Sequence, residues 1–182
     1  MALEIERRFL VSGDQWRSHV QGSRAIRQGY LATGNGELTL RVRLARPPVG
    51  AMEAHLTLKL PAFGVAAEPP PGEALTRQEY EYQIPALDAE ALLECSAHRL
   101  SKTRFDLDLP GGDWVLDVFE DVNAPLVVAE VELERADQAV TIPAWCSREI
   151  TGRRELSNAA LAHRPLEVWP EDEREALLPR GC

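Results

Sequence analysis

Pairs of charged residues of one sign recur along this chain with a single residue between them. Acidic pairs occur at Glu4/Glu6, Glu79/Glu81 and Glu130/Glu132, and basic pairs at Arg41/Arg43 and Lys102/Arg104. Residues two apart on a β-strand point to the same face, so each pair places two like charges side by side. Carboxylates in this arrangement supply oxygen ligands for Mg²⁺ or Mn²⁺, and arginines supply paired donors for phosphate oxygens. The pattern indicates a site for a phosphate compound together with a divalent metal ion.

The overall composition excludes several other classes of protein. The chain carries a formal net charge of −9, which argues against a nucleic-acid partner because phosphate backbones need a basic face. No apolar run approaches the roughly 20 residues of a membrane-spanning helix, so we expect no membrane partner. The first residues show no basic-then-apolar leader. Three cysteines without metal-binding spacing and scattered histidines give no zinc pattern, and we expect a cytoplasmic protein.

The charged pairs lie on segments in which apolar and polar residues alternate, the pattern of β-strands. About eight such segments are present, at residues 3–11, 25–31, 38–44, 55–60, 77–84, 101–109, 114–120 and 126–135. Glycines predict turns at residues 33–36 and 111–113, and a proline-rich stretch predicts a loop at residues 66–73. The sequence therefore predicts a fold dominated by antiparallel strands.

Helices are predicted around these strands. Residues 14–21 and 87–97 have helical patterns, with Asp14 and Asp88 as candidate N-caps, and residues from 137 onward look mainly helical. The clearest helical stretch there is 157–162, with Ser157 as its N-cap. We find no internal repeat, and 182 residues suit one domain. We therefore expect residues 1–182 to form a single domain with a C-terminal helical segment from about residue 155, as a monomer or homodimer.

Two arrangements of the strands can accommodate their polar faces. In an ordinary sheet packing the polar face meets water. About eight antiparallel strands can instead close into a barrel whose interior holds a ligand. The grouping of the charges into pairs of one sign favours the second arrangement. We expect an α+β fold that is mainly antiparallel β: an eight-stranded closed tunnel with a polar interior and helices packed on the outside.

The opening strand resembles the ExExK strand of the triphosphate tunnel metalloenzymes, the CYTH domain superfamily. It reads Glu4-Ile5-Glu6-Arg7-Arg8. Later segments resemble the successive segments of the same superfamily, among them Gln28-Gly29-Tyr30-Leu31, Leu40-Arg41-Val42-Arg43, Leu56-Thr57-Leu58-Lys59, Lys102-Thr103-Arg104-Phe105 and Glu130-Val131-Glu132-Leu133. The resemblance runs along the whole chain. It implies an eight-stranded antiparallel tunnel that binds triphosphate with a divalent metal, Mg²⁺ or Mn²⁺.

The resemblance also implies roles for individual residues. The implied metal ligands are Glu4, Glu6, Asp117, Glu130 and Glu132. The implied phosphate-binding residues are Arg8, Arg41, Arg43, Lys59, Lys102 and Arg104, together with Arg154 or its neighbour Arg153 from the C-terminal segment. The implied catalytic residues are Arg8, Glu4 and Glu6. For Glu79 and Glu81 we favour ion pairing with the phosphate-binding cations.

Arg8 departs from the superfamily motif, which has lysine at that position. A lysine whose pKa is depressed can lose a proton and help to activate water, whereas arginine effectively cannot. Either Arg8 only stabilises phosphate charge while a carboxylate or a metal-bound water acts as the base, or turnover is slow.

The function implied by the resemblance is metal-dependent hydrolysis of inorganic triphosphate, a small-molecule substrate. The alternatives are an adenylyl cyclase of the CYTH type that makes cyclic AMP from ATP, a thiamine triphosphatase, a nucleoside triphosphatase, or a non-catalytic binder of triphosphate or polyphosphate. Hydrolysis is favoured because the chain shows no added adenine-binding segment and no aromatic pair for a thiamine ring.

Overall fold

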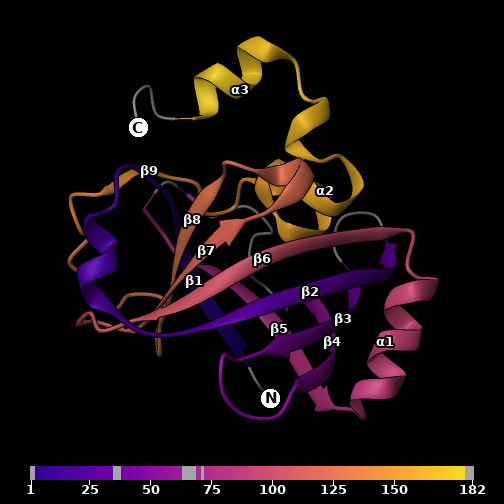
Figure 1. Ribbon diagram of the computed structural model, residues 1–182. Helices are drawn as coiled ribbons and strands as arrows, with labels where there is room; N and C mark the ends of the chain where they lie inside the picture. Colours follow the sequence, from indigo (N-terminus) through magenta and orange to yellow (C-terminus); the bar gives the residue numbers. More distant parts are fainter. Residues whose placement is uncertain (1–2, 35–37, 63–68, 71, 179–182) are drawn as a thin grey trace.

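The computed structural model describes residues 3–34, 38–62, 69–70 and 72–178 (Figure 1). Eight antiparallel strands dominate it: β1 (Leu3–Val11), β2 (Val20–Gly34), β3 (Leu38–Arg46), β4 (Glu53–Pro61), β5 (Leu75–Gln83), β6 (His98–Leu107), β7 (Asp113–Phe119) and β8 (Val127–Glu132). They are hydrogen-bonded in the order β5-β4-β3-β2-β6-β7-β8-β1, and β1 also pairs with β5. The sheet is therefore a closed eight-stranded barrel, which confirms the fold predicted from the alternation.

Strand β1 closes the barrel because its two edges serve different partners. One edge pairs with β8 from Glu6 to Leu10. The other edge pairs with β5 near the start of the strand and with a short strand, β9 (Cys146–Glu149), near its end. Strand β9 thus extends the sheet beside the barrel without entering the ring of eight.

Helices lie on two sides of the barrel (Figure 1). Helix α1 (Ala86–Cys95) packs on β2, β3 and β4. Helices α2 (Asn158–His163) and α3 (Glu171–Leu177) belong to the C-terminal segment, and α2 contacts β6 and β2. Short 3₁₀ turns occur at Gln15–His19, Asp121–Asn123, Arg154–Leu156 and Leu166–Val168. Among the described residues no helix is long and apolar enough to cross a membrane.

The barrel carries its apolar strand faces outward. Phe9 and Val11 on β1 pack with Trp114 and Trp145 in one core cluster, and Val42 on β3 packs beneath α1 in another. Because water would otherwise meet these faces, the helices and the 137–145 segment are required as a cover. The outward direction of the apolar side chains leaves the charged side chains inside the barrel.

At one end the barrel interior is also apolar. The register of the pairings places Leu10, Leu100, Phe119 and Val128 on the inward face of their strands. They form a third core cluster with C-terminal residues, chiefly Ile150, Leu156, Leu161, Leu166 and Trp169. We call this cluster the apolar plug, because it fills the end of the barrel beneath the C-terminal segment.

The structure corrects several predicted boundaries. Residues 137–153 are not helical; Val140 and Ile142 pack as extended chain on the first core cluster, and Cys146–Glu149 pairs with the edge of β1 that β5 leaves open. Tertiary pairing therefore overrode local helical pattern there.

Other boundaries shift at helix and strand ends. Residues 20–21 belong to β2, because Val20 pairs with Leu107. Pro85 occupies the N-cap position of α1, and Asp88 lies in its first turn. Asp14 precedes a single 3₁₀ turn and makes no capping bond, whereas Ser157 caps α2 as predicted, accepting from the Ala160 N–H at 3.1 Å. Parts of the predicted turn at 33–36 and loop at 66–73 lie outside the described residues.

Gly29 on β2 allows α1 to close onto the barrel. A Cβ there would lie 2.8 Å from the Ser96 Cβ, and the buried Ser96 hydroxyl donates to the carbonyl oxygens of Tyr30 and His98. We expect Gly29→Ala to lower the free energy of unfolding by about 1–3 kcal/mol because the insertion overpacks this contact. Denaturant unfolding followed by circular dichroism measures the change.

Gly22→Ala is the matched control on the same strand. A Cβ at Gly22 meets only the Asp106 Oδ2 at 3.3 Å, the end of a flexible side chain. Equal losses in both variants would contradict the close-packing role of Gly29.

Candidate active site

A cavity of about 860 Å³ occupies the barrel interior. Inward-facing side chains of β1, β3, β4, β5, β6 and β8 line it, and residues 152–163 border it on the C-terminal side. Among the described residues its lining holds eight basic side chains, Arg8, Arg41, Arg43, Lys59, Arg77, Arg104, Arg153 and Arg154, and seven acidic ones, Glu4, Glu6, Glu79, Glu81, Glu130, Glu132 and Glu155. The cavity is thus nearly balanced in charge although the chain is strongly acidic.

Strand pairing gathers four glutamates on one wall. Across the β1–β8 ladder Glu6 lies opposite Glu132, and Arg8 lies opposite Glu130. Glu4 lies two residues before Glu6 on the same face. We call Glu4, Glu6, Glu130 and Glu132 the acidic wall. These four residues were predicted to lie together from sequence, and the structure brings them together.

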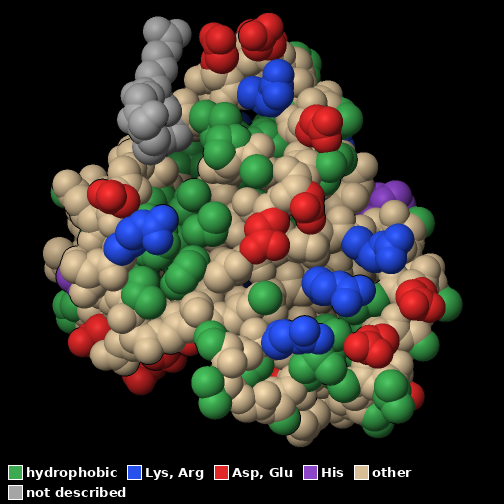
Figure 2. All heavy atoms as spheres, in the orientation of Figure 1, with side chains coloured by type: hydrophobic (Ala, Val, Ile, Leu, Met, Phe, Trp, Pro, Cys, Tyr) green, Lys and Arg blue, Asp and Glu red, His purple; other side chains and the backbone are tan. Residues whose placement is uncertain are grey.

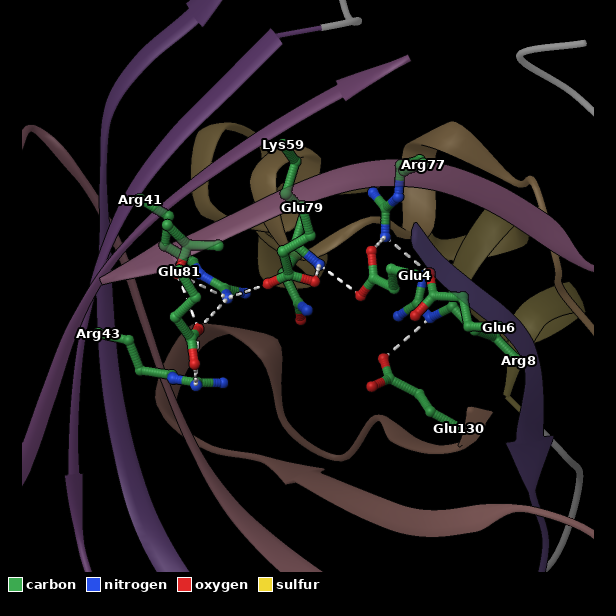
Figure 3. Close-up of polar contacts among 12 residues, drawn as sticks. Glu4, Glu6, Arg8, Arg41, Arg43, Lys59, Arg77, Glu79, Glu81 and Glu130 are labelled. Carbon is green, nitrogen blue, oxygen red and sulfur yellow. Dashed lines mark hydrogen bonds and ion pairs between the residues drawn. The ribbon is translucent and has the colours of Figure 1, made fainter. Parts of the chain in front are cut away.

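Strands β3, β4 and β5 form a second wall on which cations and carboxylates alternate (Figure 3). The Arg43 guanidinium donates to both carboxylate oxygens of Glu81 at 3.0 and 2.9 Å. The Lys59 ammonium lies 3.2 Å from Glu79 and also donates to Glu4 on the acidic wall. Arg41 lies 3.7 Å from both Glu79 and Glu81. Glu79 and Glu81 therefore hold Arg41, Arg43 and Lys59 in ion pairs, as predicted from the sequence.

Arg77 joins the two walls and was not identified from sequence. Its Nη2 lies 2.8 Å from Glu6 and 3.0 Å from Glu4 (Figure 3). It shares the alternating face of Glu79 and Glu81, and that alternation was the available signal. Its position opposite Glu4 depends on the β1–β5 register, which the sequence pattern does not specify.

The carboxylates of the acidic wall differ in their readiness to ionise. Burial opposes ionisation of Glu4, but Lys59 and Arg77 outweigh it and lower the pKa of Glu4 to about 2. Burial and the neighbouring Glu4 raise the pKa of Glu6 above its ordinary value. Burial, Glu4 and Glu79 likewise raise the pKa of Glu132. Arg104 and Arg8 outweigh burial at Glu130 and lower its pKa well below the ordinary value. The neighbouring cations therefore compensate Glu4 and Glu130, but not fully Glu6 and Glu132.

Comparison with known proteins identifies the family of this chain. The model of the CYTH domain matches residues 2–163. The chain belongs to the CYTH domain family. An inorganic triphosphatase of Acetivibrio thermocellus is 32% identical over 173 residues, which cover 94% of this chain and 100% of that protein. An inorganic triphosphatase of Nitrosomonas europaea is 36% identical over 163 residues, covering 87% of this chain and 96% of that protein.

Solved structures agree with this assignment. The crystal structure of an inorganic triphosphatase superposes with a TM-score of 0.56 at 34% identity, covering 89% of this chain and 95% of that one. A conserved hypothetical protein from Pyrococcus furiosus superposes with a TM-score of 0.53 at 14% identity, over 74% of this chain and 81% of that one. The second likeness shows the fold alone.

The acidic wall of this CYTH domain has the donor chemistry of a site for a hard divalent cation. Its ligands are all carboxylate oxygens, which such cations prefer. In the part of the chain that the structure describes, no three His, Cys, Asp or Glu side chains lie together in a metal-binding group, since Lys59, Arg77, Arg8 and Arg104 engage the glutamates. The buried Glu4 Oε2 accepts no hydrogen bond, although the Arg77 Nη2 lies 3.0 Å from it, and burial together with Glu4 raises the pKa of Glu6. A divalent cation fits this wall because its charge would compensate these buried carboxylates.

Two predicted site residues of the CYTH domain lie behind the cavity wall instead of lining it. Asp117 is 0% exposed and Lys102 is 1% exposed, and neither borders the cavity. The register places both on inward faces, but at the level where Phe119 and the C-terminal segment fill the barrel. The Lys102 ammonium lies 5.4 Å from the centre of the Phe119 ring and contacts the Asn158 Oδ1 at 3.4 Å.

Their contacts show what these two residues do in the described structure. Asp117 accepts from Lys102 and, through both oxygens at 2.7 Å, from Arg104. Arg104 in turn donates to Glu130 at 2.7 Å. Burial lowers the pKa of Lys102 to about 8 even though Asp117 opposes that change. The Lys102–Asp117 pair therefore orients Arg104 toward the acidic wall.

This arrangement makes Asp117 a structural requirement. We expect Asp117→Asn to lower the free energy of unfolding by about 3–5 kcal/mol, because it leaves Lys102 buried without its charge partner and leaves Arg104 with Glu130 alone. Chemical denaturation in the absence of metal measures the loss.

Asp106→Asn is the matched control. Asp106 makes a comparable two-oxygen pair with Arg24, but that pair is 33% and 40% exposed. Its loss is expected to cost no more than about 1 kcal/mol. If Asp117 served only a metal ion, metal-free stability would change no more in Asp117→Asn than in the control.

Proposed function

We propose that this protein hydrolyses inorganic triphosphate with the help of a divalent metal ion, Mg²⁺ or Mn²⁺. The observation that carries the proposal is the cavity itself, in which an acidic wall suited to a cation faces a set of arginines and lysines suited to phosphate oxygens. Two relatives that the chain matches over most of its length are named inorganic triphosphatases, which supports the same substrate.

The acidic wall would hold the metal through Glu4, Glu6, Glu130 and Glu132. When bound, such an ion neutralises charge on phosphate oxygens and lowers the pKa of a coordinated water. Asp117 supports this wall indirectly through Arg104, so we assign it an orienting role in place of the ligand role that the family resemblance implies.

The basic side chains of the cavity would bind the phosphate chain. Arg43 now donates to Glu81, and Arg41 and Lys59 form ion pairs with Glu79. Phosphate oxygens would replace part of these contacts. Charge-assisted bonds between guanidinium groups and phosphate are strong and directional. The resident glutamates keep the cations in place and prevent their mutual repulsion when phosphate is absent.

Proton transfer in this cavity cannot depend on Arg8, because a guanidinium keeps its proton. The acidic wall offers the alternative. Its carboxylates can accept a proton, which a guanidinium cannot do. We therefore infer that a carboxylate of the acidic wall takes the proton of the attacking water.

The lining favours a substrate without a base. Among its described residues the aromatic rings are those of Tyr30 and His163. Tyr30 is buried in the apolar plug, and its hydroxyl accepts from the Gln28 side chain at 2.7 Å. His163 stacks on His98 with ring centres 3.5 Å apart. Neither the Tyr30 ring nor the His163 ring is arranged to stack on an adenine or thiamine ring.

Product analysis tests the proposal directly. Purified protein should convert tripolyphosphate to phosphate and pyrophosphate with Mg²⁺ or Mn²⁺, and EDTA should abolish the reaction. Cyclic AMP and pyrophosphate from ATP would identify a cyclase instead, and tight binding of tripolyphosphate without release of phosphate would identify a non-catalytic binder.

The acidic wall has its own test. Glu130→Gln should lower metal-dependent kcat by about 100-fold or more, the scale found when a group that stabilises transition-state charge is removed. Phosphate release at saturating metal measures it. Glu134→Gln is the control, because Glu134 continues the same alternation beyond β8 and lies exposed outside the cavity. Similar rates in both variants would contradict a role for the acidic wall.

A further inference from the structure

The segment between β9 and the end of α2 borders the cavity on its C-terminal side. We call residues 150–163 the cover segment. It turns at Gly152, whose φ is +74°, continues through the Arg154–Leu156 turn, and ends in α2. Arg153, Arg154, Ser157 and Asn158 of the cover segment line the cavity. The positions of Arg153 and Arg154, which are predicted to bind phosphate, therefore depend on where this segment lies.

A single residue of the barrel, Arg8, contacts the cover segment at both ends of the turn. Its carbonyl oxygen accepts from the Ile150 N–H at 2.8 Å, and its N–H donates to the Thr151 Oγ1 at 3.0 Å. Its side-chain Nη1 donates to the carbonyl oxygen of Leu156 at 3.2 Å. Arg153 and Arg154 lie on the four-residue stretch between Thr151 and Leu156, so both ends of that stretch are tied to Arg8.

The other two side-chain nitrogens of Arg8 make no hydrogen bond to the cover segment. The Nε donates to Glu130 on the acidic wall at 3.0 Å. The Nη2 is buried and has no hydrogen-bond partner. Arg8 as a whole is 6% exposed and lines the cavity. A buried, unsatisfied N–H of a cation costs free energy. Figure 3 shows Arg8 between Glu6 and Glu130, on the acidic side of the cavity.

We propose that Arg8 is a positioning residue for the cover segment: it fixes the Leu156 carbonyl, and through it Arg153 and Arg154, while its Nη2 takes an oxygen of the bound phosphate chain. Occupation of the cavity then stabilises the position of the cover segment, and the cover segment stabilises binding. This inference rests on the proposed function for the identity of the ligand, but the tie between Arg8 and Leu156 is a property of the protein alone.

A lysine could not perform this role. The guanidinium presents donors in a planar fork, so that Glu130, Leu156 and a phosphate oxygen can be served in three directions. An ammonium places its donors on one nitrogen at the end of a flexible chain. Arg8→Lys therefore keeps the charge and the backbone contacts to Ile150 and Thr151 but removes the simultaneous link to Glu130 and Leu156.

Hydrogen exchange without ligand tests the tie. In Arg8→Lys, amide exchange should accelerate about tenfold across residues 156–163, the effect of losing one bond to a charged donor, while β2–β4 exchange as in the wild type. Arg7→Lys is the matched control. Arg7 is the neighbouring residue on the opposite face of β1 and makes a two-oxygen pair with Glu149 outside the cavity, so exchange in residues 156–163 should not change.

Kinetics with tripolyphosphate test the consequence. Arg8→Lys should raise KM about tenfold, with a smaller change in kcat, whereas Arg7→Lys should leave both unchanged. Arg154→Ala should also raise KM. In the double variant Arg8→Lys/Arg154→Ala, KM should rise by less than the product of the two single increases, because Arg8 acts partly through Arg154.

A second variant perturbs the cover segment without touching Arg8. A Cβ at Gly152 would lie 2.8 Å from the Pro69 Cδ and would adopt a strained φ, so Gly152→Ala should reproduce the faster exchange and the raised KM. Unchanged exchange in residues 156–163 in Arg8→Lys, or fully multiplicative kinetic losses, would overturn the positioning role. Failure of the wild type to release phosphate would overturn the proposed function alone, since the exchange experiment needs no turnover.

Discussion

The need to pair every charge inside a closed barrel is the constraint on which this structure depends. Charges removed from water are costly unless a partner and hydrogen bonds compensate them. The strand registers meet this need, because they place Arg77 beside Glu4, Arg8 beside Glu130 and Arg104 beside Asp117. Closure of the barrel also depends on charge pairing, since Arg77 on β5 contacts Glu4 and Glu6 on β1, the two strands whose pairing closes the barrel. The same pairings that permit the fold also assemble the cavity.

Pairing within the protein also prepares the cavity for its ligands. The cations of β3 and β4 already lie in fixed positions because Glu79 and Glu81 hold them, so a phosphate chain meets donors that need little reorganisation. The acidic wall behaves differently. Burial, together with repulsion from Glu4, raises the pKa of Glu6, and a divalent cation would offset that cost. The cations of the second wall are thus paired in the free protein, whereas Glu6 and Glu132 of the acidic wall are not fully compensated.

The alternation of the sequence was enough to predict which side chains face inward, because the period of two is a local property of a strand. It predicted the barrel, while the family resemblance implied the grouping of Glu4, Glu6, Glu130 and Glu132. Alternation could not predict depth along the barrel axis, which depends on register. It therefore gave no sign that Lys102 and Asp117, which the resemblance assigned to the site, lie one layer behind it, or that Arg77 joins the two walls. Strand β9 was also missed, since its pairing depends on the edge of β1 that β5 leaves open.

The outward-facing apolar strands have a consequence for how stability and function are linked. Figure 2 shows charged and hydrophobic side chains interspersed on the surface. The apolar strand faces lie beneath covering segments. On the C-terminal side the covering residues Leu156, Leu161 and Leu166 complete the apolar plug, while Arg153 and Arg154 of the same segment line the cavity. Any movement of this segment would therefore disturb a hydrophobic core. Arg8 lies at the boundary between the charged cavity and the plug, two residues before Leu10 on the same face. Its side chain links the two, because it donates to Glu130 on the cavity side and to the Leu156 carbonyl oxygen on the side of the plug.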